Sequence, residues 1–254
     1  MSLSVLMVTK NAGEVIGEAL ESIDGLWDEL LVGDAGSTDA TVEIVKEYKG
    51  RIVRQSGNNL GGRKQKLVKK AGSDWTLILD SDERVSDDLR HEIKEILAGN
   101  HRGIAGWRIP YQNYVFNRPV FYGGEKYSKV RLFKKHKGHV TAVPLHEDIN
   151  MQGKLGDLKG VIYHHSYRTP FQLLSKFTRY ARIAAVQKKR AGEKLTPNKL
   201  FLYGPHMFWS RFFVDKGYKD GWRGLVLAAA FAYMETLTYW LLFCSPKNLK
   251  IPRA

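Results

Sequence analysis

The sequence predicts an α/β domain built on a parallel sheet, followed by a helical, aromatic-rich C-terminal extension, and three observations support this fold class. In the first 100 residues short apolar runs alternate with stretches of helical periodicity, which is typical of βα units whose helices cover both faces of a sheet. Residues 103–168 show extended patterns without a long helix between them, so the sheet is expected to become mixed or antiparallel there. From residue 169 the periodicity is helical again.

The elements of the first 100 residues follow local signals. Strands are predicted at 3–9, 29–34, 51–54 and 75–80, the first and last of them buried, and helices at 14–23, from about 40, 63–71 and 87–97. Thr38 or Ser37 is expected to cap the helix that begins near residue 40, and Ser86 the last of these helices. Residues 58–62 are rich in Asn and Gly and are predicted to form a loop.

The second half of the chain adds further strands and then helices. Extended segments are predicted at 106–111, 114–116, 129–134, 140–145 and 158–163. Thr169-Pro170 and Thr196-Pro197 each predict a helix start, the first helix reaching about residue 190 and the second spanning 198–215. We therefore expect a catalytic domain at 1–168, with halves at about 1–100 and 101–168, and an extension at 169–254.

Residues 222–243 are nearly all apolar, but Glu235 divides them into stretches too short for a membrane-spanning helix. Two interpretations remain open. In the first, the hydrophobic helices lie in a membrane interface, with Trp and Tyr at headgroup level and Lys and Arg toward anionic lipid. Alternatively, they pack against the catalytic domain or a second subunit, so an oligomer is also open.

Composition excludes several protein classes. With 254 residues and 43% apolar content, the chain can bury a sizeable core and is not disordered. Its single Cys244 excludes an internal disulfide and a Cys-based zinc cluster, which suits a reducing cytoplasm. No signal peptide is visible, and strand-like sequence begins at once.

The net charge of +14, from 40 basic and 26 acidic residues, predicts attraction to nucleic acid, anionic lipid or a phosphorylated substrate. The basic stretches 126–139 and 176–194 place the expected partner on the second half of the chain.

Three acids, Asp80, Asp82 and Glu83, follow the predicted strand at 75–80. Strand ends of this kind are where α/β proteins bind ligands. Acids so close together repel one another unless a cation shares the site, and a hard divalent ion bridging to substrate phosphates would provide it. A solvated acidic turn explains this stretch equally well. Because the chain has neither G-x-G-x-x-G after its first strand nor a P-loop, a metal ion on Asp80 and Asp82 is the candidate for holding phosphates.

Two later groups supply what the acid cluster lacks. His146, Glu147 and Asp148 include a candidate general base, and His164 and His165 are candidate nitrogen ligands. Taken singly, an exposed acidic turn and ordinary half-buried histidines are the better interpretations.

Three motifs, in this order and spacing, resemble the family 2 glycosyltransferases of GT-A fold: Val5-Leu-Met-Val-Thr-Lys-Asn11, Val32-Gly-Asp-Ala-Gly-Ser-Thr-Asp-Ala-Thr41 and Leu77-Ile-Leu-Asp-Ser-Asp-Glu83. The groups at 146–147, 164–167 and 217–222 resemble the bacterial branch that builds the lipopolysaccharide or lipooligosaccharide core, the β-1,4-glucosyltransferase-like group. The resemblance covers most of the chain. It implies a GT-A-type, Rossmann-like mixed sheet with helices on both faces.

The resemblance also assigns roles to residues around the donor. It implies that Thr9, Asn11 and Asp34 lie around the nucleobase and ribose, and that Arg63 or Lys64 lies close to the donor. One departure concerns the second strand, where the family often has two acids and this chain has Ala35 after the first. The Q-x-x-R-W motif of processive synthases is absent, which argues against a polymerising enzyme.

On the metal and the base, the resemblance implies that Asp80 and Asp82 form the D-x-D pair on Mg²⁺ or Mn²⁺ and the sugar diphosphate. Glu147 would remove the acceptor proton, with Asp148 as the alternative. His164 or His165 would complete the metal shell or position an acceptor phosphate.

The function expected from this resemblance is inverting sugar transfer from a nucleoside-diphosphate sugar to a lipid-linked, anionic glycan such as a lipopolysaccharide core. UDP-glucose is the expected donor, with another UDP-hexose or ADP-heptose open. We expect a cytoplasmic enzyme, peripheral on the inner face of the cell membrane through its C-terminal extension, with no nucleic-acid partner. A nucleotidyltransferase, which would release pyrophosphate, shares the metal acids. A nucleic-acid-binding protein would explain the charge alone and would not need Asp80 or Asp82.

Overall fold

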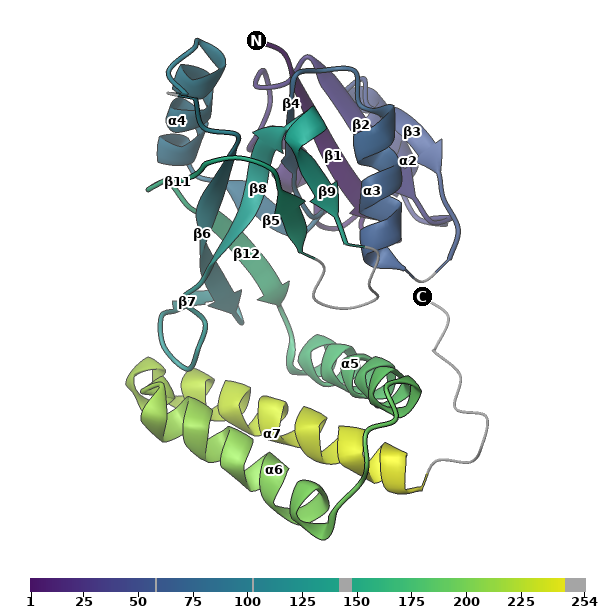
Figure 1. The fold of residues 1–254 in the computed structure, drawn as a ribbon, viewed down its shortest axis with the longest axis vertical. Helices are drawn as coiled ribbons and strands as arrows, with labels where there is room; N and C mark the ends of the chain where they lie inside the picture. Colours follow the sequence, from purple (N-terminus) through teal and green to yellow (C-terminus); the bar gives the residue numbers. More distant parts are fainter. Residues whose placement is uncertain (58, 102, 142–147, 245–254) are drawn as a thin grey trace. The chain divides into compact units, whose positions relative to one another are not determined.

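The computed structural model describes residues 1–57, 59–101, 103–141 and 148–244, and these divide into two compact units (Figure 1). Unit 1 comprises Met1–Tyr111 and Tyr127–His164, and unit 2 comprises Gln112–Lys126 and His165–Ala254. Unit 2 thus takes in a segment that precedes the C-terminal helices by some distance in the chain. The catalytic and C-terminal domains expected at 1–168 and 169–254 remain a prediction.

Unit 1 begins with the predicted parallel strands. These are β1 (Leu3–Thr9), β2 (Glu29–Asp34), β3 (Arg51–Arg54) and β4 (Trp75–Ile78), in the order β3-β2-β1-β4. Thr9 lies opposite Asp34 in the register of β1 and β2. The carboxyl ends of these strands therefore meet at one edge of the sheet, where the sequence placed the motifs.

Helices cover both faces of this sheet, because the buried side chains of β1 alternate between two hydrophobic clusters. One face packs against α1 (Ile16–Glu21), α2 (Thr41–Glu47) and α4 (Asp87–Leu97). The other packs against α3 (Leu60–Lys70) and the hairpin of β9 (Gly138–Val140) and β10 (Ile149–Met151). The predicted two-sided covering is confirmed.

Antiparallel strands extend the sheet, so the expected mixed sheet is also confirmed. They are β8 (Ser128–Lys134), β6 (Gly106–Val115), β12 (Ile162–Tyr167) and β5 (Glu83–Val85). β8 pairs with β4 on one side and with β6 on the other, and β12 pairs with β5. The full order is β3-β2-β1-β4-β8-β6-β12-β5, with β7 (Arg118–Val120) and β11 (Leu155–Asp157) paired to β6. A turn of 3₁₀-helix, Lys135–Lys137, joins β8 to β9.

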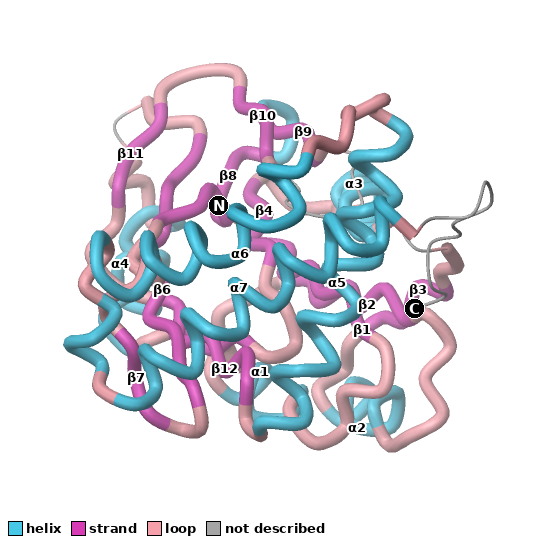
Figure 2. Tube along the Cα trace, turned by 90° about the horizontal axis from the view of Figure 1, so that it is seen from below, coloured by secondary structure: helices cyan, strands magenta, loops and turns pink. Residues whose placement is uncertain are grey.

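Unit 2 contains the C-terminal helices. They are α5 (Pro170–Arg190), α6 (Pro197–Trp209), a π-helical turn η2 (Ser210–Val214), a 3₁₀ turn η3 (Gly217–Asp220) and α7 (Trp222–Phe243). Thr169 and Thr196 cap α5 and α6 as predicted, each accepting a backbone N–H through its hydroxyl. α7 contacts both other long helices, and Figure 2 shows all three α-helices of this unit in a second view.

Some local predictions were wrong. α3 begins at Leu60 and not at Arg63, because the side chain of Asn59 caps it by accepting the Gly62 N–H at 2.8 Å. α2 starts after Ala40 without a side-chain cap, so neither Ser37 nor Thr38 plays that part. The helix predicted at 198–215 turns π-helical at residue 210. The strand predicted at 140–145 is described only to residue 141, since 142–147 lie outside the described residues.

Candidate active site

The loops that follow β1 and β2 are hydrogen-bonded to each other at the carboxyl edge of the sheet. The Asn11 backbone N–H donates to Ser37 Oγ at 2.9 Å, and Asn11 Oδ1 accepts the Thr38 N–H at 2.9 Å. Asp39 accepts the Gly13 N–H at 2.8 Å. Its hydrogen bonds, first that from the Thr41 hydroxyl, lower the pKa of this exposed carboxyl. The first two motifs therefore form one connected edge.

Thr9 and Asp34 lie side by side at this edge but differ in their partners. Both oxygens of the buried Asp34 carboxylate are occupied by the turn that follows β2, since they accept the backbone N–H groups of Gly36 and Ser37 and the Ser37 hydroxyl. The hydroxyl of Thr9 is buried without a hydrogen-bond partner. Asp34 thus shapes the turn, and Thr9 retains a polar group without a hydrogen-bond partner.

Arg63 fastens the ends of the first two strands. Its Nη2 donates to the carbonyl oxygens of Thr9 at 3.1 Å and Gly33 at 3.0 Å, and its Nε donates to Gln55 Oε1 at 3.1 Å. Burial lowers the pKa of the guanidinium, and the charge of Asp34 opposes that shift. These donors are committed to the sheet edge, so contact of Arg63 with a donor remains a prediction.

Lys64 pairs with the first acid of the cluster. Its Nζ lies 2.7 Å from Asp80 Oδ1 and 3.1 Å from Oδ2, and only 1% of the Lys64 side chain is exposed. Asp80 follows Leu79, whose N–H still bonds to Leu6 O at 3.1 Å beyond the end of β4. The strand therefore delivers Asp80 directly onto a buried ammonium group.

Arg131 on β8 is a second cation in the cluster, and its Nη2 lies 3.3 Å from both Asp80 Oδ2 and Glu83 Oε1. Its Nε donates to the hydroxyl of Tyr111 at 2.5 Å. Glu83 itself is buried and accepts the Asp80 N–H at 2.9 Å. Glu83 thus supports the loop 80–83 from inside, and Arg131 joins the two ends of that loop.

The charges in this cluster are fixed by their neighbours. Burial would raise the pKa of Asp80, but the charges of Lys64 and Arg131 outweigh it and hold the pKa at about 2. Burial raises the pKa of Tyr111 well above its usual value. Burial would lower the pKa of Arg131, yet Tyr111, Glu83 and Asp80 together raise it. At neutral pH, Asp80 is a carboxylate, Arg131 a cation and Tyr111 a neutral phenol.

Asp82 faces a different neighbour. Its Oδ2 lies 3.5 Å from His164 Nε2, and 28% of the Asp82 side chain is exposed. Successive side chains of a strand point to opposite faces. His165 accordingly stacks on the ring of Tyr114, with centroids 4.4 Å apart. Of the two histidines, the structure places His164 at the acid loop.

Asp82 and His164 fit a divalent ion as an incomplete ligand set. Two ligands of one Mg²⁺ or Mn²⁺ can lie up to about 4.2 Å apart, since each bond is about 2.1 Å long, and such ions keep sites for water and substrate phosphates. Across the described parts of the chain, no three His, Cys, Asp or Glu side chains lie close enough together to hold a metal ion by themselves. Both oxygens of Asp80 already contact cations, Oδ1 that of Lys64 and Oδ2 those of Lys64 and Arg131.

Of the two candidate bases, only Asp148 is described, because Glu147 lies outside the described residues. Asp148 is exposed; its N–H donates to Thr141 Oγ1 at 2.9 Å and its carbonyl oxygen accepts the Thr141 N–H at 2.9 Å, which closes the neck of the loop between β9 and β10. That loop leaves β9 next to α3, since the Val140 N–H donates to Gln65 Oε1 at 2.7 Å. It therefore starts beside the helix that carries Lys64.

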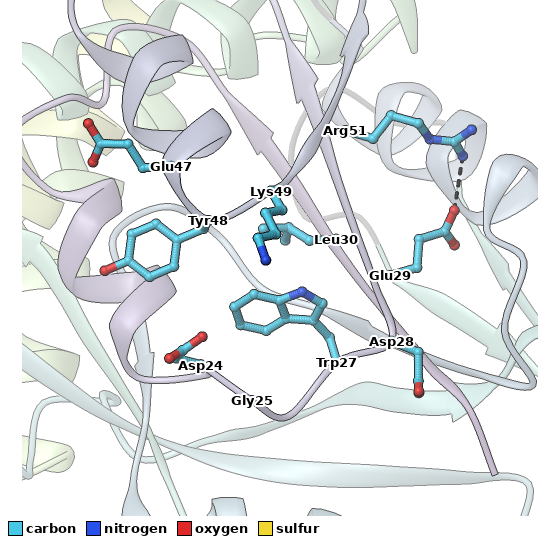
Figure 3. Close-up of a pocket in the computed structure, with 10 residues that line it drawn as sticks. All are labelled: Asp24, Gly25, Trp27, Asp28, Glu29, Leu30, Glu47, Tyr48, Lys49 and Arg51. Carbon is cyan, nitrogen blue, oxygen red and sulfur yellow. Dashed lines mark hydrogen bonds and ion pairs between the residues drawn. The ribbon is translucent and has the colours of Figure 1, made fainter.

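A groove of about 890 Å³ lies away from these residues (Figure 3). It is lined by Glu29 and Leu30 at the start of β2 and Arg51 at the start of β3, with the rings of Trp27 and Tyr48. It thus opens at the amino end of the parallel strands. Since ligands of such sheets bind at the carboxyl ends, the strand-end cluster is the better candidate site.

Comparisons with known proteins agree with this arrangement. Residues 4–147 match the family model described as Glycosyl transferase family 2. The chain belongs to glycosyltransferase family 2. The match spans the parallel strands, the acid loop and the segment up to the candidate base, and it confirms the resemblance carried by the motifs.

This family 2 glycosyltransferase is similar to curated proteins over almost its whole length. An uncharacterized glycosyltransferase of Rickettsia typhi is 26% identical over 252 residues, which span 92% of this chain and 84% of the relative. The lipopolysaccharide core biosynthesis glycosyltransferase LpsC of Rhizobium meliloti is 25% identical over 250 residues, 94% of this chain and 90% of LpsC.

Among solved structures, S. aureus TarS 1-349 in complex with UDP shares the fold, with a TM-score of 0.51. It is 16% identical, and the alignment covers 94% of this chain and 89% of that one. The likeness confirms the predicted GT-A-type sheet with a helical C-terminal extension.

Two residues of this glycosyltransferase site, Arg131 and Tyr111, were missed by the sequence reasoning. The repulsion among the acids predicted a shared cation, and the cation expected there was a metal ion. A signal for Arg131 was present, because it stands between Val130 and Leu132 in a predicted strand. A charged side chain flanked by apolar residues needs an acidic partner when the strand is buried.

Proposed function

We propose that this glycosyltransferase transfers a sugar, with inversion, from a nucleoside-diphosphate sugar to a lipid-linked, anionic glycan such as a lipopolysaccharide core. The observation that carries the proposal is the pair Asp82 and His164, held next to a rigid, charge-balanced loop at the carboxyl edge of a family 2 domain. UDP-glucose is the donor we propose first, with another UDP-hexose or ADP-heptose as alternatives.

The leaving diphosphate gains negative charge as the glycosidic bond to it breaks, so the site has to stabilise that charge. We propose Mg²⁺ or Mn²⁺ on Asp82 and His164, which when bound would neutralise charge on the diphosphate. Lys64 and Arg131 keep the loop in place before donor arrives, because they already compensate Asp80 and Glu83. Thr9, with its unused hydroxyl, and Asn11 are proposed to contact the nucleoside.

An acceptor hydroxyl that attacks the anomeric carbon has to lose its proton, and a carboxylate on the opposite side of the sugar ring from the leaving group gives inversion in one step. We propose Glu147 as this base, with Asp148 as the alternative. Asp148 follows Glu147 in the chain, and its side chain is exposed.

The acceptor is proposed to be lipid-linked because the relative LpsC is named for lipopolysaccharide core biosynthesis and because this chain is strongly basic. We propose that the enzyme works in the cytoplasm, peripheral to the inner face of the membrane. Within the described residues one helix, α7, is long and apolar enough to cross a membrane, by length and composition alone.

The proposal is tested by thermal stabilisation of the protein with a panel of sugar nucleotides, with and without Mn²⁺. A ligand at about 100 times its Kd stabilises the folded state by about 2.7 kcal/mol, which a melting curve resolves. Asp82→Asn should remove the Mn²⁺-dependent part of the shift, and the control Asp157→Asn, at an exposed acid outside the site, should keep it. Equal Mn²⁺-dependent shifts in wild type and Asp82→Asn would refute the metal role.

Product analysis completes the test. Incubation of the enzyme with a bound donor and an acceptor should release a nucleoside diphosphate. Release of pyrophosphate from a nucleoside triphosphate and a sugar phosphate would instead identify a nucleotidyltransferase and overturn the proposed reaction.

A further inference from the structure

The transfer chemistry proposed above assigns no role to the motif Gly217-Tyr-Lys-Asp-Gly-Trp222, but unit 2 gives it a clear structural role. The carboxylate of Asp220 accepts the backbone N–H groups of Phe121, at 3.0 Å, and Tyr122, at 2.9 Å. Phe121 and Tyr122 lie in the loop that follows β7, about 100 residues earlier in the chain. The motif therefore clamps this loop.

A second contact holds the same loop. The guanidinium of Arg211, in η2, donates to the carbonyl of Gly123 and to Glu125 Oε1, the latter at 2.9 Å. Asn113 Nδ2 donates to Glu125 Oε2 at 2.9 Å and to the Glu125 carbonyl at 3.0 Å. The loop is thus tied on both sides by charged or amide side chains, and its tip is rigid.

The turn that carries the motif is closely packed as well. A Cβ atom on Gly224 would lie 1.8 Å from the Gly217 carbonyl oxygen, and one on Gly217 would lie 2.6 Å from the Arg211 carbonyl oxygen. Only glycine allows this approach of η2, η3 and the start of α7. The clamp and the turn therefore form one fixed corner of unit 2.

This corner presents large side chains to solvent. We name as the aromatic corner the exposed rings Phe121, Tyr122, Trp209, Phe213, Tyr218 and Trp222. Four of them make ring contacts: Trp209 with Phe213 at 4.4 Å, Tyr218 with Phe212 at 6.3 Å and Trp222 with Phe116 at 5.6 Å. The backbone of the other two, Phe121 and Tyr122, is held by Asp220. Trp222 remains 54% exposed although it is stacked. A rigid cluster of exposed aromatic rings of this size indicates an interaction surface.

Basic side chains accompany the rings. Lys219 Nζ lies 5.2 Å from the centre of the Tyr122 ring, and the Arg223 guanidinium 4.4 Å from the centre of the Trp222 ring. The segments 116–126 and 209–225 contain six basic and three acidic residues. Two of those acids, Glu125 and Asp220, are occupied by the clamp. The outward-facing charge of the aromatic corner is therefore positive.

We propose that the aromatic corner docks on the surface of an anionic lipid bilayer, with its rings at headgroup level and its Lys and Arg side chains on lipid phosphates. Trp and Tyr are enriched at that depth of a membrane, and Lys and Arg extend from it toward headgroup charge. The inference rests on the proposed function in one respect, because a lipid-linked acceptor lies in the same surface.

The contacts of α7 favour docking through the corner over a membrane span. α7 contacts α5 and α6, and near its end the buried Tyr239 bonds to both Lys188, at 3.0 Å, and Glu193, at 3.1 Å. Glu193 also binds Lys199 at 2.8 Å. A span would place this charged cluster at or within the hydrocarbon at high cost, whereas docking through the corner leaves it in water.

The test is flotation of the full chain with vesicles of phosphatidylcholine alone and of phosphatidylcholine mixed equally with phosphatidylglycerol. Wild type should float with the anionic vesicles only, and added salt should weaken this binding. The double variant Phe121→Ser/Tyr218→Ser should bind them roughly tenfold more weakly or worse, because two rings no longer insert. Phe171→Ser, at an 80% exposed ring on α5, is the matched control and should bind like wild type.

Circular dichroism and the donor-induced thermal shift check that the double variant is folded with an intact donor site. Equal binding of wild type and the double variant, or equal loss in Phe171→Ser, overturns the proposal. So does a wild type that ignores vesicles and forms a dimer that the double variant loses, since the partner is then a second copy. Flotation needs no sugar transfer, so an inactive wild type that floats would refute the proposed function and leave the docking surface standing.

Discussion

Replacing Arg131 by Met should strongly destabilise unit 1, because this side chain compensates the buried Glu83 and the half-buried Asp80 at once. Its Nη2 lies 3.3 Å from Asp80 and from Glu83, and its Nε bonds to Tyr111. Asp80 keeps Lys64 as a partner in the variant. Glu83, whose side chain is 1% exposed, loses a charge that its surroundings cannot replace with water.

Removing one partner of a buried ion pair costs about 3–5 kcal/mol, since the remaining charge is left without compensation. We expect Arg131→Met to lose stability in that range. Arg131→Lys should lose less, about 1–3 kcal/mol, because the charge stays and the bond to Tyr111 goes. The matched control is Arg108→Met. Arg108 donates from Nε and Nη2 to the two carboxylate oxygens of Asp157, at 2.7 and 2.8 Å, but both side chains are exposed. An exposed pair contributes about 0–1 kcal/mol.

Hydrogen exchange read by mass spectrometry at increasing urea measures this change for unit 1 separately from unit 2. Peptides that cover β4 and the loop 80–83 should lose protection at lower urea in Arg131→Met, and the Asp80 amide should exchange early because it bonds to Glu83. Equal losses in Arg131→Met and Arg108→Met would show that the buried charges are compensated in some other way, and the reasoning would fail.

Three further predictions concern other parts of the chain. Glu193→Gln should remove an acid-dependent loss of stability in unit 2. Hydrogen bonding, above all to Lys199, lowers the pKa of Glu193 from 4.5 to about 2. The stability that Glu193 contributes is therefore present above pH 4.5 and disappears as the pH falls toward 2, which acid titration followed by circular dichroism measures. Glu147→Gln should bind donor normally but transfer about 10²–10⁴-fold more slowly, and near-normal transfer would assign the base to Asp148 or elsewhere. Gly224→Ala should cost about 1–3 kcal/mol in a urea titration, because its Cβ would meet a backbone carbonyl at 1.8 Å, and an unchanged midpoint would contradict the packing.

The parallel half of the sheet could be predicted because its signals are local. The strands β1, β2 and β4 are short runs of mainly apolar residues, and each of the three motifs continues directly past the end of its strand. The predicted start of α3 was wrong, because two glycines after Asn59 suggested a loop. In the structure the Asn59 side chain caps the helix. The signal of a capping residue was present, and the low helix propensity of glycine obscured it.

The site could be predicted only as far as its members lie close in sequence. Arg131 follows Asp80 by 51 residues and reaches it because β8 pairs antiparallel with β4. The choice between His164 and His165 likewise depends on which face of β12 meets the acid loop, and the pairing of His164 with Glu83 decides it. Pairings of this length are set by the whole sheet, so no local pattern contains them.

The ion pairs of the acid loop, residues 80–83, determine which of its acids already have a cationic partner. Asp80 and Glu83 are balanced by Lys64 and Arg131, so this group of four carries no net charge and holds the loop without a metal ion. Asp82 lies outside this group of four, and its Oδ2 is 3.5 Å from His164 Nε2. The metal ion proposed above would be held by Asp82 and His164, while Asp80 keeps its contacts with Lys64 and Arg131. Because the loop is already ordered before the ligand binds, no binding free energy is lost in ordering it. That binding free energy can then stabilise the transition state.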